Sequence, residues 1–239
     1  MSILLSFECM RKKLIDNLVS EYKFIRHSVI GESVCKRDID CLQIGNENSM
    51  TLWVGAFHGM EWLTSFLLLK FVRTLCRNIE SSKNISGVNI DNQLQKRGLC
   101  IVPCLNPDGV EISTRGSLSA GKYKHFIDEI SAGDTSRWQA NAHGVDLNHN
   151  YDAGWKELHQ LEIESGITGP GPTRYGGTNP ESEPETKFLV KLCEKYNFEH
   201  AIAFHSQGEE IYWKYGKNIP ENSNILSKVF AISSGYELS

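Results

Sequence analysis

Two continuous apolar runs, separated by a helical segment, constrain the fold of this chain most. Residues 51–57 (TLWVGAF) and 99–105 (LCIVPCL) are apolar at nearly every position, whereas residues 62–77 have the length and composition of an apolar helix. Strands without polar alternation are buried on both faces, as in a parallel sheet that helices cover. A helix over 187–196 followed by a short strand over 200–204 repeats the pattern. These runs predict an α/β fold with a largely parallel sheet covered on both faces.

The other segments predict shorter elements. The first fifty residues favour a helix, with Leu14, Leu18 and Tyr22 on one face, and then two strands. Residues 166–179 are too rich in glycine and proline for regular structure and should form a surface loop. The expected positions are strands at 27–30 and 39–44, a turn at 106–109 (NPDG), a capping box at 182–185 and a helix at 225–232 leading into a strand at 236–238.

Composition places the chain among globular proteins. Its 239 residues are 40% hydrophobic and 23% charged, which suits one domain with a single core. A net charge of −4 gives no electrostatic reason to expect nucleic acid as a partner. No run reaches the roughly 18 apolar residues of a membrane span, and the N-terminus does not resemble a signal peptide. We therefore expect a soluble, cytoplasmic protein that does not associate with membranes; its oligomeric state is not predicted.

Cysteine usage excludes two kinds of site. The seven cysteines are odd in number, scattered and never arranged as CxxC. This pattern is not typical of a disulfide framework or of a cysteine-ligated zinc site. The thiols are interpreted as buried or unreactive groups.

A histidine and a carboxylate follow the first apolar strand. In the segment GAFHGME, His58 and Glu61 lie on the same side if Gly59 turns the chain into the next helix. Two histidines and one carboxylate form a common catalytic zinc site with an open fourth position. His205, which ends another apolar strand, is the candidate for the third ligand, because strand ends at one edge of an α/β sheet converge. Each motif alone would more often be a solvent-facing pair or a core histidine; their shared position at strand ends favours a metal site.

A third motif, GVDLNHN at 144–150, allows two interpretations. Asx residues near a strand end commonly form a turn. Alternatively, Asp146 can hold a zinc-bound imidazole, while Asn148 and His149 present polar groups to a ligand.

The motifs together resemble the zinc carboxypeptidase A superfamily. HxxE, NPDG, GVDLNxN, PESEPET and HSQG occur in that family's order over residues 27–239. The resemblance implies one zinc ion held by His58, Glu61 and His205. It also implies that Asp146 partners His58 and that Asn148 contacts a substrate carboxylate. The implied fold is a mixed, twisted sheet with helices on both faces.

The sequence departs from the carboxypeptidases at two substrate positions. The carboxypeptidases have arginine at the position of His149, and an imidazole cannot form the same bidentate hydrogen bonds with a carboxylate. The variant GVDLNHNYDAGW, with GPTRYGG and HSQGEEIYW, is instead similar to the bacterial γ-D-glutamyl-L-diamino acid endopeptidases, which cut peptidoglycan stem peptides. Gln139 occupies the place of an oxyanion-stabilising arginine, so Arg137 or another group would have to compensate.

A third departure concerns the general base. The family's catalytic glutamate lies on a strand well downstream of the last zinc ligand, and the acids after His205 do not match it; these are Glu209, Glu210, Glu221 and Glu237. No general base is therefore assigned. We expect residues 1–239 to be a single zinc peptidase domain that lacks its C-terminal strands and helix.

The leading hypothesis is a zinc metallopeptidase acting on the γ-D-glutamyl to diamino acid bond of peptidoglycan fragments through a metal-activated water. The alternatives are a remnant that binds zinc and peptides without hydrolysing them, an ordinary metallocarboxypeptidase, and a deacylase of small amides.

Overall fold

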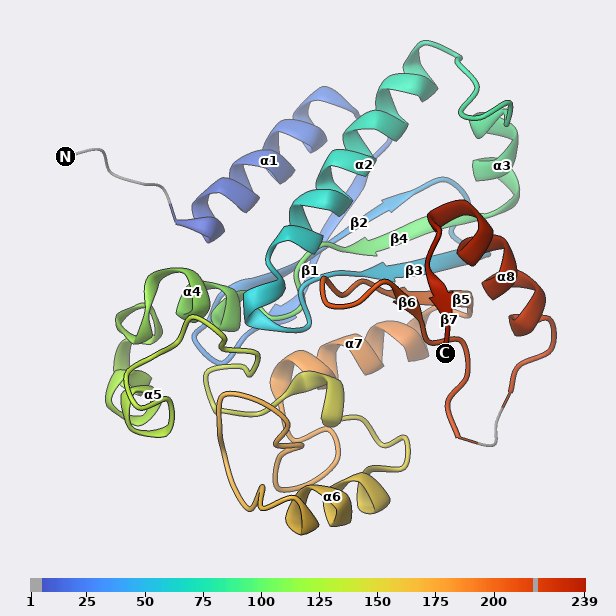
Figure 1. The fold of residues 1–239 in the computed structure, drawn as a ribbon. Coiled ribbons are helices and arrows are strands. Elements are labelled where there is room, and N and C mark those ends of the chain that lie inside the picture. Colours follow the sequence, from blue (N-terminus) through green and yellow to red (C-terminus); the bar gives the residue numbers. More distant parts are fainter. Residues whose placement is uncertain (1–5, 217–218) are drawn as a thin grey trace. The chain divides into compact units, whose positions relative to one another are not determined.

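The computed structural model describes residues 6–216 and 219–239, and the chain divides into two compact units, Met1–His205 and Ser206–Ser239. The first unit contains a five-stranded sheet in the order β1-β2-β4-β3-β5 (Figure 1). Its strands are β1 (Arg26–Glu32), β2 (Asp38–Ile44), β3 (Met50–Val54), β4 (Gly98–Val102) and β5 (Phe198–Ala203). β3 pairs in parallel with β4 and β5, whereas β1–β2 and β2–β4 are antiparallel. The predicted α/β class with a mixed sheet is therefore confirmed.

Helices cover both faces of this sheet. α1 (Phe7–Glu21) and α2 (Leu63–Glu80) lie side by side over one face, and α7 (Pro184–Lys195) lies against the other (Figure 1). Successive strand residues point to opposite faces, so β2 contributes Leu42 and Ile44 to the core under α1 and α2, and Ile39 and Cys41 to the core over α7. Burial on both faces explains why β3 and β4 lack polar alternation.

The central strands end earlier than the apolar runs suggested. β3 was expected to reach residue 57 and β4 residue 105, but they end at Val54 and Val102. Ala56 has a positive φ of 48°, which interrupts the extended backbone after β3. The remaining apolar residues form the turn that leads to the candidate site.

Two local predictions were wrong. The expected turn at 106–109 is the start of α4 (Pro107–Arg115), where the side chain of Asn106 accepts a hydrogen bond from the backbone of Gly109 at 2.8 Å. The expected capping box at 182–185 is absent, because α7 begins after Glu183 without a side-chain cap. Glu185 is fully buried and accepts hydrogen bonds from Val34 and Asn141 instead. The carboxylate of Glu185 therefore binds residues that are distant in the sequence and does not cap the helix.

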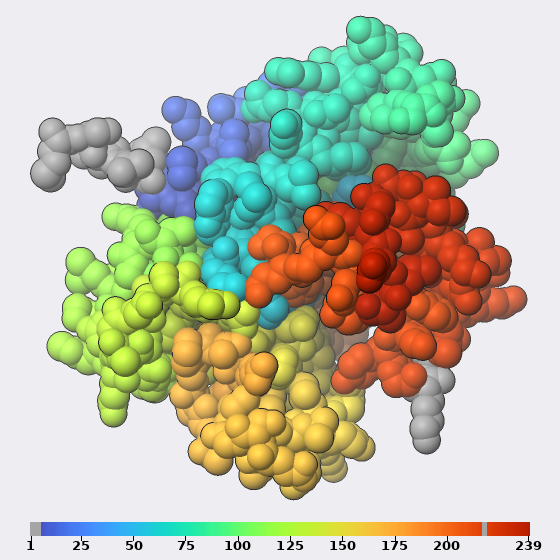
Figure 2. Space-filling view, in the orientation of Figure 1, coloured from blue at the N-terminus to red at the C-terminus, as the bar shows by residue number. Residues whose placement is uncertain are grey.

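Shorter elements complete the first unit: α3 (Ile90–Lys96), η1 (Gly59–Glu61), η2 (Ser117–Tyr123), α5 (Lys124–Ile130), η3 (Leu147–His149) and α6 (Trp155–Glu164). Residues 166–179 contain no helix or strand, as predicted. Figure 2 shows α6 and this loop, in yellow and light orange, on the surface of the face drawn.

The second unit contains β6 (Glu210–Ile211), α8 (Ser223–Ser234) and β7 (Glu237–Leu238), with β6 and β7 paired in parallel. The predicted helix at 225–232 and strand at 236–238 are confirmed. The single domain expected for residues 1–239 stays a prediction. Among the residues that the structure describes, no helix combines the length and apolarity needed to cross a membrane.

Candidate metal centre

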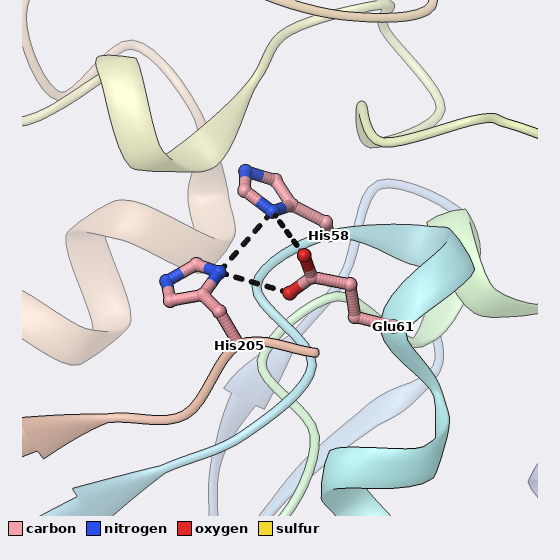
Figure 3. Close-up of side chains that lie close together, drawn as sticks. All are labelled: His58, Glu61 and His205. Atoms are coloured by element: carbon pink, nitrogen blue, oxygen red, sulfur yellow. Dashed lines mark hydrogen bonds and ion pairs between the residues drawn. The ribbon is translucent and has the colours of Figure 1, made fainter. Parts of the chain in front are cut away.

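The three predicted ligands converge at one edge of the sheet. His58 follows β3, Glu61 lies in η1, and His205 follows β5, the parallel neighbour of β3 (Figure 3). The Nδ1 atoms of His58 and His205 are 3.3 Å apart, and these atoms lie 3.2 Å and 2.9 Å from the two carboxylate oxygens of Glu61. The ligand atoms of all three residues lie within 4.8 Å of one another. Two imidazoles and one carboxylate therefore point at a common centre.

A close backbone approach shapes the turn between His58 and Glu61. The amide of Gly59 donates to the carbonyl of Gln139 at 3.0 Å, and the amide of Met60 donates to that of Trp138 at 2.9 Å. A Cβ on Gly59 would lie 2.3 Å from the carbonyl oxygen of Gly109. Only glycine fits there, which explains its position inside the HxxE motif.

Asn106 lies fully buried beneath the site and was not predicted as a site residue. Its amide donates to the carbonyls of Phe57, Gln139 and Ala140 at 3.0, 3.1 and 3.1 Å. It thereby ties the turn before His58 to the segment that contains Gln139. The NPDG motif was the available signal, but a turn asparagine and a buried structural asparagine look alike in sequence.

Asp146 lies against His58, the residue for which the resemblance implied it as a partner. Its Oδ1 lies 3.2 Å from Nε2 of His58, and its oxygens also accept from the amides of Asn148 at 3.1 Å and Arg174 at 3.0 Å. An ionised carboxylate only accepts hydrogen bonds, so Nε2 of His58 carries the proton. When Nδ1 gives up its proton to a metal ion, its lone pair is directed toward the space shared with His205 and Glu61.

The electrostatics of this group favour its charged forms. Burial disfavours protonation of His58, but hydrogen bonds with Asp146 and Glu61 outweigh it and raise the His58 pKa to about 9. Burial opposes ionisation of Glu61, yet hydrogen bonds with His205 and His58 lower its pKa to about 2. The Asp146 pKa is lowered despite burial, mainly by the His58 hydrogen bond and then by the charge of His58.

The donor set fits a zinc ion. Glu61 has a side chain only 2% exposed, and a buried carboxylate needs positive charge nearby. A dication at the point where its oxygens face two imidazole nitrogens would supply that charge and displace the protons. Two histidines and one carboxylate also leave the open position of a catalytic zinc site.

The predicted substrate residues are held around this centre by other contacts. Asn148 is exposed and uses its backbone amide to bind Asp146. His149 contacts Glu162 through Nδ1 at 2.8 Å, and the amide oxygen of Gln139 accepts a hydrogen bond from Thr173. Their roles toward a substrate stay predictions.

The loop at 172–176 contacts three residues around this centre. Its residues contact Gln139 through Thr173, Asp146 through Arg174, and Glu162 through Gly176. The sequence predicted a surface loop here but not its role as the common support of three site residues.

Comparisons with known proteins agree with this geometry. The model of the family described as Zinc carboxypeptidase matches residues 12–235. The chain is 32% identical to γ-D-glutamyl-L-diamino acid endopeptidase 1 of Lysinibacillus sphaericus, covering 93% of this chain and 56% of the relative. It is 30% identical to the uncharacterized protein YqgT of Bacillus subtilis, covering 94% of this chain and 60% of the relative. The chain thus spans somewhat over half the length of these curated relatives.

Solved structures show the same fold. Bovine thrombin-activatable fibrinolysis inhibitor, in complex with a tick carboxypeptidase inhibitor, superposes with a TM-score of 0.70 at 20% identity, covering 98% of this chain and 75% of that chain. The family match covers nearly the whole chain, and the ligand set that characterises such enzymes is assembled in space. The chain therefore belongs to the zinc carboxypeptidase family.

Proposed function

We propose that this chain carries the zinc site of a metallopeptidase that hydrolyses the γ-D-glutamyl to diamino acid amide of peptidoglycan stem peptides. The observation that carries the proposal is the convergence of His58, Glu61 and His205, with Asp146 behind His58. The substrate class is supported by the relative from Lysinibacillus sphaericus, whose name states that activity.

In this proposal, different residues would hold the metal, orient its ligand and bind the substrate. His58, Glu61 and His205 would hold the zinc ion, which when bound supplies a Lewis acid and lowers the pKa of a bound water. Asp146 keeps His58 in the tautomer that leaves Nδ1 free. Asn148 and His149 would bind the substrate, and Gln139 would donate an uncharged hydrogen bond to the scissile carbonyl. The general base is left unassigned.

His149 separates this proposal from ordinary carboxypeptidase activity. A guanidinium grips a free C-terminal carboxylate with two parallel hydrogen bonds, whereas an imidazole offers one. Here Nδ1 of His149 is already engaged by Glu162, which leaves only Nε2 for a ligand. Trimming of ordinary peptide C-termini should therefore be weak.

The non-hydrolysing alternative differs from this proposal in whether a general base acts at the site. In the described part of the chain, the metal group contains a single carboxylate, Glu61, and that carboxylate is a ligand. A water on zinc needs a separate group to accept its proton, a contribution of roughly 10²- to 10⁴-fold to the rate. A zinc-dependent peptide-binding role without hydrolysis is the second candidate, which the assay below separates from catalysis.

The test is a paired assay on the full protein that contains these residues, after zinc analysis. L-Ala-γ-D-Glu-diaminopimelate should be hydrolysed much faster than a standard peptide with a free C-terminal residue. His149→Arg should shift the ratio toward the standard peptide, whereas His125→Arg, at an exposed position on α5, should not. Faster release of ordinary C-terminal residues by the unmodified protein would exclude the endopeptidase role. Zinc-dependent binding of the γ-D-glutamyl peptide without turnover would support the second candidate. The cytoplasmic location stays a prediction that fractionation of cells can test.

A further inference from the structure

A buried carboxylate behind His149 has no lysine or arginine partner among the described residues. Glu162, on α6, has a side chain only 3% exposed. Its Oε1 lies 2.8 Å from Nδ1 of His149, and its Oε2 lies 3.2 Å from Nδ1 of His159 and 3.2 Å from the amide of Gly176. Three N–H groups therefore surround one carboxylate.

The surroundings hold Glu162 in place. His159 stacks on Trp155 with ring centroids 4.5 Å apart, and the indole of Trp155 donates to the carbonyl of Gly176 at 2.9 Å. The carbonyl of Gly176 thus accepts a hydrogen bond from Trp155, and its amide donates one to Glu162. The carboxylate is part of a packed arrangement and cannot easily turn away from His149.

This arrangement determines which nitrogen of His149 faces outward. An ionised carboxylate can only accept hydrogen bonds, so Nδ1 of His149 must carry a proton. In the neutral imidazole, Nε2 then has a lone pair and is an acceptor. Nε2 has no hydrogen-bond partner in the described residues, and the side chain is 24% exposed.

The local charge differs from that of an arginine at the same position. A guanidinium would bring one positive charge, whereas a neutral His149 backed by Glu162 brings one negative charge. His149 is also joined to the candidate zinc site, since its amide donates to the carbonyl of Asp146 at 3.0 Å within η3. This position therefore favours a cation that donates hydrogen bonds and disfavours a carboxylate.

We infer that Glu162 is a positioning residue that fixes His149 as a hydrogen-bond acceptor for a primary ammonium of the substrate. The inference rests on the proposed function, because the diamino acid of such a peptide carries a side-chain ammonium. An ammonium has three donors and no acceptor, which matches the lone pair of Nε2. Loss of one hydrogen bond to a charged group should lower affinity by roughly 10- to 100-fold.

The first test needs no substrate. Long-range ¹H–¹⁵N NMR of the histidine-labelled protein at pH 8, assigned with His149→Gln, should show His149 as the neutral tautomer protonated at Nδ1. Glu162→Gln should give a mixture of tautomers, because an amide can either accept from Nδ1 or donate to it. Glu164→Gln makes the same change at an exposed position on α6 and should leave the His149 signal unchanged. An Nε2-protonated or doubly protonated His149 in the unmodified protein would overturn the inference, whether or not the variants fold.

The second test measures recognition of the ammonium. Calorimetry on the zinc-loaded protein should show tighter binding of L-Ala-γ-D-Glu-L-Lys than of the same peptide with an acetylated lysine side chain. This preference should disappear in Glu162→Gln and in His149→Gln but persist in Glu164→Gln. An equal preference in Glu162→Gln and the unmodified protein would contradict the positioning role. If neither peptide binds, the ammonium role fails together with the proposed function, while the NMR result still decides the orientation of His149.

Discussion

Replacing Asp146 by asparagine tests the candidate zinc site through a residue that does not touch the metal. Oδ1 of Asp146 faces Nε2 of His58 at 3.2 Å and the amide of Asn148 at 3.1 Å, and Oδ2 faces the amide of Arg174 at 3.0 Å. All three groups are donors when His58 is the tautomer that leaves Nδ1 free. An asparagine has one acceptor oxygen, so it cannot satisfy both sides.

Each orientation of the new amide has a distinct cost. If the oxygen stays with His58, the NH₂ group opposes the amide of Arg174, and the loss of that partly buried hydrogen bond should destabilise the fold by about 1 kcal/mol. If the amide flips, NH₂ faces Nε2 of His58 and moves the imidazole proton to Nδ1, where it blocks the metal. Loss of such an orienting partner typically weakens metal binding by about 10- to 100-fold, or roughly 1.4–2.7 kcal/mol.

The assay is competition for zinc with a chromophoric chelator at pH 7.5, together with thermal unfolding of the zinc-free protein. Asp134→Asn is the matched control, because Asp134 also accepts from a backbone amide two residues later, that of Ser136 at 2.9 Å, but is exposed. We expect the control to keep the unmodified affinity. An Asp146→Asn variant that folds, retains its melting temperature and binds zinc within about threefold of the unmodified protein would refute the assigned role of Asp146.

Three further predictions follow from the same contacts. His205→Ala should reduce zinc affinity by more than about 100-fold, because it removes a ligand, whereas His200→Ala on the exposed face of β5 should not; full zinc occupancy in His205→Ala would mean a different third ligand. Gly59→Ala would place a Cβ 2.3 Å from the carbonyl oxygen of Gly109, so urea unfolding should show destabilisation of roughly 3 kcal/mol, and unchanged stability would contradict the close packing. Burial raises the pKa of Glu185 to about 8 from 4.5, so its neutral form stabilises the fold fully below pH 4.5, and this contribution is lost as the pH rises to about 8. Glu185→Gln should therefore gain stability over the unmodified protein across that window, by up to roughly 5 kcal/mol, and parallel stability curves from pH 5 to 9 would contradict it.

Sequence reasoning succeeded where local patterns carry the information. Continuous apolar runs predicted the central strands, because burial on both faces of a sheet removes polar alternation. His58, Glu61 and His205 were placed from their positions directly after such strands, and Asp146 from a family motif. These residues depend on strand ends meeting at one sheet edge, which follows from parallel pairing.

The tertiary structure alone decided how the supporting side chains are used. Asn106 was predicted to be a turn residue, but it is buried and its side chain donates hydrogen bonds to three backbone carbonyls. Glu185 was predicted to cap a helix, but its carboxylate accepts hydrogen bonds from Val34 and Asn141. Glu162 had no distinguishing sequence context, yet it holds His149. A buried polar group takes whichever partners the fold brings within about 3 Å, and those partners lie far away in the sequence. The sequence by itself determined the central strands, the helices α1, α2, α7 and α8 and the identity of the ligand residues, because each is marked by the local pattern around it. The orientation of the imidazoles and the partners of the buried carboxylates depend on distant segments, so only the folded chain determines them.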